Sequence, residues 1–167
     1  MLVLVTYGSK LGGTRGLAEM VVDALRDEGV EAEPRPAAEV RDLAPYDAVV
    51  VGGALYAFRW PRDARRFVKR HTAALRRLPT YFFSSGPLDD SAPTTEIPPV
   101  RGVQRLMRRV GARGHVTFGG RMPADATGVP AQSMAKTNAG DWRDPDHVRT
   151  WVTSIVPDLR PHRQDAA

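Results

Sequence analysis

The chain has 167 residues, 42% of them apolar, and this length is most simply one domain with enough apolar side chains for a core. It has no cysteine, which excludes disulfides and thiolate metal sites, and its four histidines show no ligand spacing, so no metal is expected. The net charge is +5, and no apolar run is long enough to cross a membrane. We therefore expect no transmembrane segment and a cytoplasmic location.

Short apolar runs alternate along the chain with segments of helical periodicity. The predicted strands are residues 2–7, 30–35, 47–52, 80–84 and 115–118. The predicted helices are residues 14–28, 61–77, 99–110 and a last one with Asp144 as cap and Pro145 at its first position. This alternation is typical of an α/β three-layer sandwich with a doubly wound sheet. We expect a five-stranded parallel sheet in the order 2-1-3-4-5.

The first strand ends in a segment rich in hydroxyls and glycines. The spacing Ser9-x-x-Gly12-x-Thr14 lacks the Gly-Lys-Ser/Thr of a nucleoside triphosphate loop and the G-x-G-x-x-G of a dinucleotide fold. Because a helix follows, its N-terminal amides would favour an anion. The segment suits a single terminal phosphomonoester. An ordinary strand-to-helix turn with Thr14 as cap is the alternative.

Two further strands end in loops at the same edge of the sheet, because the carboxyl ends of parallel strands lie together. The loop after the third strand holds Tyr56, Phe58 and Trp60, whose rings can lie against a large flat heterocycle. The loop after the fourth strand runs from Ser84 to Leu88. One loop for a phosphate and two for a planar ring together indicate flavin mononucleotide (FMN).

These loops resemble those of the flavodoxin family, and within it the flavodoxin-type, quinone-dependent protoporphyrinogen oxidases. The resemblance extends through about Pro157 and rests on the first loop, residues 53–60, the helix with Phe67 to His71, residues 84–88, Gly119-Gly120 and residues 140–143. It implies a flavodoxin-like fold, FMN as the cofactor, an FMN-binding domain over residues 1–158 and a flexible C-terminal tail over residues 159–167.

The expected cofactor-binding residues form three groups, one for each loop. The phosphate group comprises Ser9, Lys10, Leu11, Gly12, Gly13 and Thr14. The residues expected on one side of the flavin ring are Ala54, Leu55, Tyr56 and Trp60. Those expected on its other side are Ser84, Ser85, Gly86 and Leu88. No side chain stands out as a catalytic acid or base, and hydride transfer requires none.

The resemblance implies an FMN-dependent oxidoreductase that oxidises protoporphyrinogen or a related substrate by two electrons, with a quinone as acceptor. The third loop has no aromatic residue to cover the outer ring face, which leaves room for a small-molecule redox substrate. An electron-transfer protein serving a redox partner protein is the alternative, and a flavin-free interaction domain is another. The oligomeric state stays open, a homodimer included.

Much of the positive charge falls on the predicted helices 61–77 and 99–110, whose opposite faces are apolar. We interpret most of it as solvated helix surface and expect no nucleic-acid partner, because the arginines are not interleaved with exposed aromatic residues. Arg59 and Arg62 flank the second loop, where positive charge would favour reduced flavin. A receiver domain shares this topology, but Gly52-Gly53 stands where part of its acidic cluster would lie.

Two long loops, residues 86–98 and 121–143, are expected on the flavin edge, and either is placed to contact a substrate. Trp142, in the second loop, either covers the flavin ring or packs under the last helix.

Overall fold

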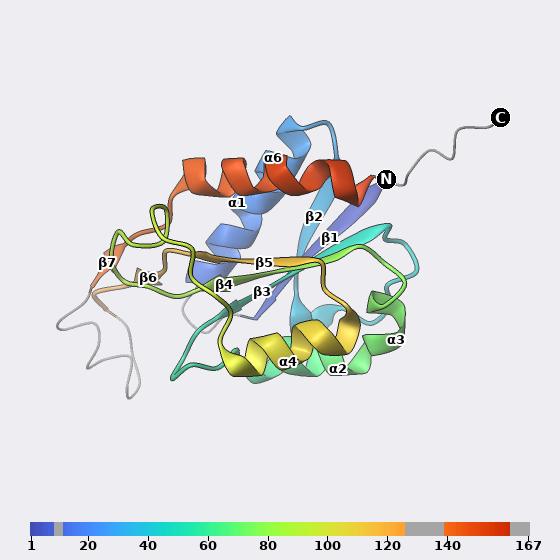
Figure 1. Cartoon of the computed structure of the whole chain (residues 1–167), viewed down its shortest axis with the longest axis horizontal. Helices are drawn as coiled ribbons and strands as arrows, with labels where there is room; N and C mark the ends of the chain where they lie inside the picture. Colours follow the sequence, from blue (N-terminus) through green and yellow to red (C-terminus); the bar gives the residue numbers. More distant parts are fainter. Residues whose placement is uncertain (9–11, 126–138, 161–167) are drawn as a thin grey trace.

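The computed structural model describes residues 1–8, 12–125 and 139–160. Five parallel strands form one sheet in the order β2-β1-β3-β4-β5, which confirms the predicted topology (Figure 1). The strands are β1 (Leu2–Gly8), β2 (Glu31–Pro36), β3 (Ala48–Ala54), β4 (Thr80–Ser85) and β5 (Gly114–Phe118). Central strands of a parallel sheet are covered on both faces, and β1, β3 and β4 are accordingly buried along nearly their whole length.

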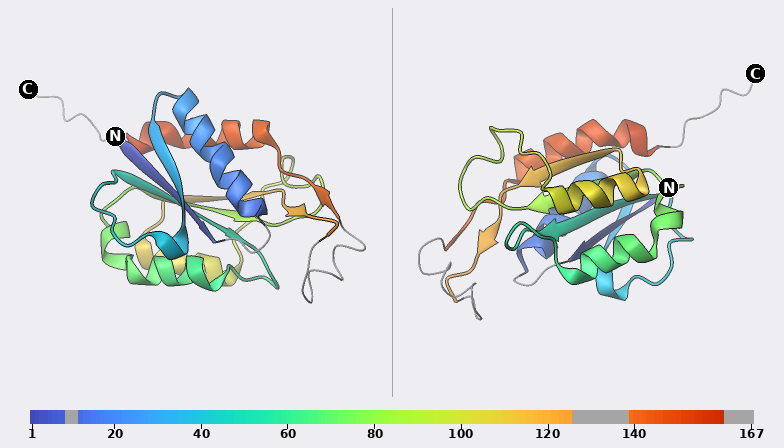
Figure 2. Two further views of the ribbon diagram at one scale, coloured as in Figure 1. Left: turned by 180° about the vertical axis from the view of Figure 1, so that it is seen from behind. Right: turned by 60° about the horizontal axis from the view of Figure 1, so that its bottom comes forward.

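Helices cover both faces of the sheet and complete three layers. One layer is formed by α1 (Gly13–Asp27) and α6 (Pro145–Leu159), and the other by α2 (Arg62–Arg70), α3 (Thr72–Leu75) and α4 (Arg101–Val110) (Figure 2). Each layer closes its own apolar core against the sheet. Among the described residues, no helix is both long and apolar enough to span a membrane.

The helix predicted over residues 61–77 is two helices, α2 and α3, which meet at His71. The Thr72 hydroxyl donates to the carbonyls of Val68 and Lys69 at 3.0 Å, and such bonds compete with the helical backbone pattern. The predicted cap of the last helix is present, because Asp144 accepts from the amide of Asp146 at 2.9 Å. Leu159, predicted as the first residue of the flexible tail, is instead the buried last residue of α6. Residues 161–167 lie outside the described part, so the rest of the tail stays a prediction.

Two elements of the described residues were not predicted from the sequence. A short 3-10 helix, η1 (Ala37–Glu39), follows β2. An antiparallel ribbon, formed by β6 (Arg121–Met122) and β7 (Gly140–Asp141), lies within the predicted loop 121–143. Two-residue strands are too short to show a periodicity. The ribbon extends beyond the carboxyl edge of the sheet, on the side of α1 and α6 (Figure 1).

Candidate flavin site

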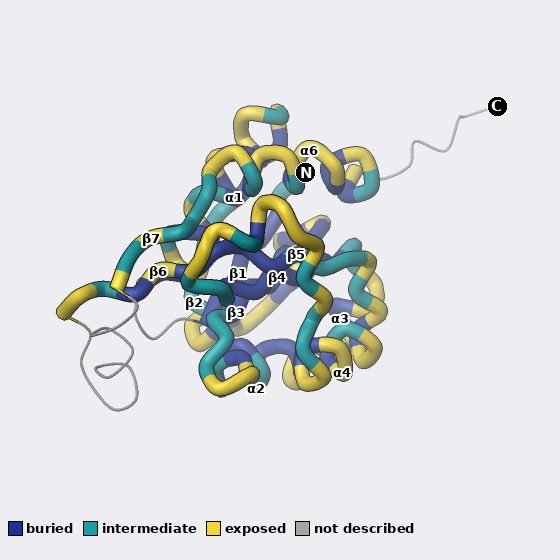
Figure 3. Tube along the Cα trace, turned by 60° about the vertical axis from the view of Figure 1, so that its left-hand side comes forward, coloured by how far each residue is buried: buried dark blue, intermediate teal, exposed yellow. Residues whose placement is uncertain are grey.

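The carboxyl ends of three neighbouring strands bring the three predicted loops together. Gly8 of β1 is in register with Gly53 of β3, and Gly53 is in register with Ser84 of β4. These glycines sit where side chains would collide, since a Cβ on Gly8 would lie 2.6 Å from Oδ1 of Asp63. Figure 3 shows the buried strands converging on this edge, with exposed helix surfaces around them (Figure 3). At this edge of the sheet, the glycines therefore let neighbouring groups approach the strand backbones closely.

The first loop ends at the N-terminus of α1. Gly12, the N-cap of α1, has φ of 77°, a left-handed conformation that glycine adopts without strain, and no side chain of the described residues caps the helix. Thr14 is 1% exposed, and its hydroxyl has no partner among the described residues. Thr14 therefore does not act as the cap. A buried hydroxyl beside the N-terminal amides of a helix suits an anionic oxygen. Ser9, Lys10 and Leu11 lie outside the described residues.

The second loop makes a tight turn with an exposed aromatic ring. The backbones of Tyr56 and Arg59 exchange two hydrogen bonds of 2.9 Å around Ala57 and Phe58. Both central residues are left-handed, with φ of 47° and 59°, which costs roughly 1–2 kcal/mol for each non-glycine residue. Phe58 is 83% exposed, whereas Tyr56 is partly buried and burial raises the pKa of its hydroxyl. Strain of this kind concentrates at ligand sites.

The predicted ring contacts do not include Phe58, although it alternates with Tyr56 and Trp60 in the sequence. Alternation alone does not say which of the three rings is exposed. In the structure the exposed ring is that of Phe58, whereas Trp60, two residues further along the chain, points into the core.

Trp60, one of the predicted ring contacts, lies in the core of the protein. It is 2% exposed and packs on Phe82 with ring centroids 5.0 Å apart. Its indole lies against Gly53, where an added Cβ would be 2.5 Å from Cγ of the ring. The Nε1–H donates to Oγ of Ser84 at 2.9 Å. A tryptophan buries a large apolar area once its single N–H has a partner, and here both conditions are met inside the protein.

The third loop packs against the second. The Leu55 amide donates to the Ser85 carbonyl at 2.8 Å, and a Cβ on Gly86 would lie 3.3 Å from Cδ1 of Leu55. Gly120, two residues after β5, lies against this loop, because an added Cβ would be 3.1 Å from the Gly86 carbonyl oxygen and 3.4 Å from Cδ2 of Leu88. Ala54 is the last residue of β3, where it is in register with Ser85. The predicted ring-contact residues other than Trp60 are therefore gathered in one place.

The Ser84 hydroxyl is engaged inside the protein rather than offered to a ligand. Its Oγ accepts from Trp60 and lies 2.9 Å from Nε2 of His115 on β5. Burial lowers the pKa of His115 to about 4, so this imidazole is neutral at pH 7. Ser84 can therefore meet a cofactor only through its backbone.

The ribbon places two arginines beside the first turn of α1. The Arg143 guanidinium forks the Asp141 carboxylate, with Nε–Oδ1 of 2.9 Å and Nη2–Oδ2 of 2.6 Å, and lowers the pKa of that carboxyl. It lies over Gly16, where an added Cβ would be 2.0 Å from Nη1, while Arg121 lies against Gly13. This arrangement was not predicted, since no local pattern links residues so distant along the chain.

The strand order and the loops gathered at the carboxyl ends of the strands define a flavodoxin-like α/β protein. Solved structures share this fold. The alignment with a cysteine-to-serine variant of flavodoxin from Pseudomonas aeruginosa covers 96% of this chain and 100% of the flavodoxin, at 18% identity and a TM-score of 0.61. A short-chain flavodoxin associated with a non-canonical PDU bacterial microcompartment covers 96% and 99%, at 15% identity and a TM-score of 0.63. At these identities, the likeness is one of fold.

The flavodoxin domain family model matches residues 4–126, so the chain belongs to the flavodoxin domain family. Among curated proteins, the protoporphyrinogen IX dehydrogenase [quinone] of Escherichia coli K12 is 26% identical over 86 residues. That match covers 50% of this chain and 48% of the relative, so the chain matches about half the length of its curated relatives. Family membership confirms FMN as the expected cofactor. The unpaired Thr14 hydroxyl at the helix N-terminus fits its phosphate.

Proposed function

We propose that this chain is an FMN-dependent oxidoreductase that oxidises protoporphyrinogen or a related substrate by two electrons, with a quinone as acceptor. The observation that carries the flavin site is the buried Thr14 hydroxyl in the first turn of α1, which has no partner among the described residues and lies next to the aligned ends of β1, β3 and β4. The substrate class is supported by the similarity to the quinone-dependent dehydrogenase.

The first loop would hold the FMN phosphate through Gly12, Gly13 and Thr14, together with Ser9, Lys10 and Leu11. Ala54, Leu55 and Tyr56 would contact one side of the ring system, and Phe58 joins them as the exposed aromatic side chain of that loop. Ser85, Gly86 and Leu88 would contact the other side, with Ser84 contributing its backbone. Bound FMN would supply the redox chemistry by accepting and passing on two electrons.

The protein's own part is to bind and orient. The third loop has no aromatic side chain, so a flat substrate can approach the ring from that side. Arg59 is exposed next to Phe58, and its positive charge favours the reduced, anionic form of a flavin nearby. That bias suits a protein that takes electrons from a substrate.

The alternative is an electron-transfer protein that serves a redox partner protein. The solved flavodoxins that share its fold support this reading. The two functions differ in how they pass electrons. A carrier should titrate in two separated one-electron steps, whereas an oxidoreductase should titrate in one two-electron step. A potentiometric titration of the FMN-loaded protein distinguishes them.

The direct test is an anaerobic assay with protoporphyrinogen and a soluble ubiquinone analogue, followed by porphyrin fluorescence. Each porphyrin requires three successive two-electron oxidations, each of which reduces one quinone to quinol. We expect porphyrin to form over many turnovers and only when both FMN and the quinone are present. Porphyrin formation equal to that of free FMN without protein would contradict the proposed enzyme. Failure to retain FMN on gel filtration would contradict the carrier as well.

A further inference from the structure

The two helical layers carry opposite charge. On one face of the sheet, α2 and α4 together hold nine lysines and arginines and one acidic residue, Asp63. On the other face, α1 and α6 together hold three arginines and five acidic residues. Among these four helices, the positive charge therefore falls on α2 and α4, while α1 and α6 carry a small negative excess. An uneven field of this kind orients a charged partner before contact.

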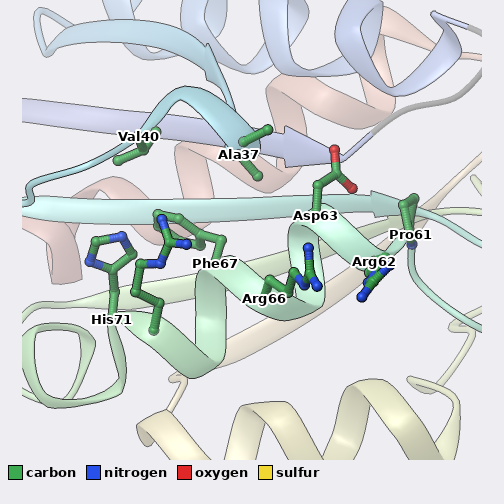
Figure 4. A pocket seen from close by; sticks show the side chains of 10 residues that line it. Ala37, Val40, Pro61, Arg62, Asp63, Arg66, Phe67 and His71 are labelled. Carbon is green, nitrogen blue, oxygen red and sulfur yellow. The ribbon is translucent and has the colours of Figure 1, made fainter.

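The basic layer contains a groove between α2 and η1, with a volume of about 440 Å³ (Figure 4). Its apolar lining is formed by Ala37, Val40 and Phe67. Along one side lie Arg62, Arg66 and Arg70, spaced four residues apart and so on one face of the helix. All three arginines are exposed, and within the described part of the chain none has an ion pair or a side-chain hydrogen bond.

The groove continues past the end of α2. A second hollow of about 330 Å³ shares His71 with the first and is lined by Leu43, Tyr46 and Arg77. Both hollows therefore combine apolar residues with arginine, and one carboxylate lines each of them, Asp63 in the first and Asp42 in the second. A site of this length fits an extended chain better than a single ion, and each guanidinium can fork one carboxylate.

We propose that this groove binds an acidic segment of a partner protein, with carboxylates on Arg62, Arg66 and Arg70 and apolar side chains on the Phe67 floor. The inference adds a partner to the proposed function and needs no flavin. The loop from β3 to α2 joins the carboxyl edge of the sheet to the start of α2 (Figure 1), and its last residue, Pro61, lines the groove. A partner bound here therefore lies beside the proposed flavin edge.

Other anionic surfaces fit less well. A membrane-binding helix presents apolar side chains outward, but Ala64, Phe67 and Val68 of α2 are buried against the sheet. Phe58 and Met1 are the exposed large apolar side chains of the described residues, and neither belongs to a helix. A nucleic-acid surface would interleave stacking aromatics with the arginines, and the groove has none exposed.

The test is fluorescence anisotropy with a labelled peptide of Glu-Glu-Leu-Leu repeats. Three variants are compared with the unchanged chain: the triple reversal R62E/R66E/R70E, the matched reversal R101E/R105E/R108E on α4, and Ala38→Trp, which fills the groove without altering charge. We expect the affinity to fall by about tenfold or more, or about 1.4 kcal/mol, in the first and third variants. We expect a fall below about threefold in the α4 variant.

Equal losses of peptide affinity in the two charge-reversal variants would contradict the groove as the binding site. Equally tight binding of an all-glutamate peptide, or no peptide binding at all, would also contradict it. Tighter, groove-dependent binding of phosphatidylglycerol vesicles or of a DNA duplex would overturn the choice of partner. FMN retention is measured for every variant. Loss of FMN from the unchanged chain counts against the proposed function alone, because the peptide result does not require the cofactor.

Discussion

The indole N–H of Trp60 donates to Oγ of Ser84 across 2.9 Å, and this bond ties the loop after β3 to the end of β4. Both residues are almost completely buried, at 2% and 1% exposure. The bond therefore holds two site loops in register without presenting either side chain to a ligand.

Replacing Ser84 with alanine should lower the free energy of unfolding by about 1–3 kcal/mol, because the Trp60 N–H would stay buried without an acceptor. Urea unfolding followed by circular dichroism measures this loss. In a Trp60→Phe background the same replacement should cost less, since the donor is gone. FMN affinity should change little in Trp60→Phe. A large loss of affinity with intact stability would return Trp60 to the ring contacts.

Thr14→Val should weaken FMN binding by about 10- to 100-fold, which corresponds to a hydrogen bond of about 1.5–3 kcal/mol to a charged group. The flavin-free protein should be equally or slightly more stable, because the lost hydroxyl was buried and unpaired. Flavin fluorescence quenching and thermal unfolding measure the two effects.

Thr6→Val is the matched control for Thr14→Val. The Thr6 hydroxyl is also fully buried and without a partner in the described structure, but it lies within β1. The Thr6 variant should gain stability and keep its FMN affinity. Equal FMN affinity in both variants would remove Thr14 from the phosphate site. Thr14→Glu should abolish FMN binding, since it puts a carboxylate where the phosphate belongs.

Gly53→Ala should destabilise the protein by about 1–3 kcal/mol, because the new Cβ would lie 2.5 Å from the Trp60 ring in a close-packed core. Gly102→Ala is the control. Its Cβ would meet nothing within 4 Å in α4, so it should stabilise the helix by about 0.5–1 kcal/mol. Thermal unfolding of the two variants should give shifts of opposite sign, and shifts of the same sign would contradict this packing.

Burial of His115 should make stability fall with acid. Its pKa is lowered from 6.5 to about 4 in the folded protein, so the unfolded chain takes up the proton first. The stabilising contribution is complete above pH 6.5 and is lost as the pH falls from 6.5 to about 4, by at most about 3 kcal/mol.

His115→Gln should flatten the dependence of unfolding free energy on pH between 6.5 and 4, while Gln keeps a group within reach of Ser84. His71 and His147, whose pKa values burial also lowers, contribute the same slope to both proteins. Urea unfolding at a series of pH values gives the difference. Parallel curves for variant and unchanged chain would show that His115 titrates normally.

The sequence by itself determined the layered sheet and where its loops gather. The apolar runs of β1, β3 and β4 and the helical periodicity between them are local signals, and parallel strands joined by helices have few ways to assemble. The hydroxyl- and glycine-rich end of β1 therefore already indicated the proposed phosphate site at Thr14. Asp144 and Pro145 fixed the start of α6 for the same local reason.

Only the tertiary structure decided which residues face the site and which fill the core. Trp60 and Phe58 look equivalent in the sequence, but the space beneath Gly53 and the acceptor on Ser84 bury one ring and leave the other exposed. The Arg143–Asp141 fork over Gly16 and the arginine groove along α2 join segments distant in the chain. Packing and charge pairing depend on three-dimensional neighbours, which periodicity does not encode.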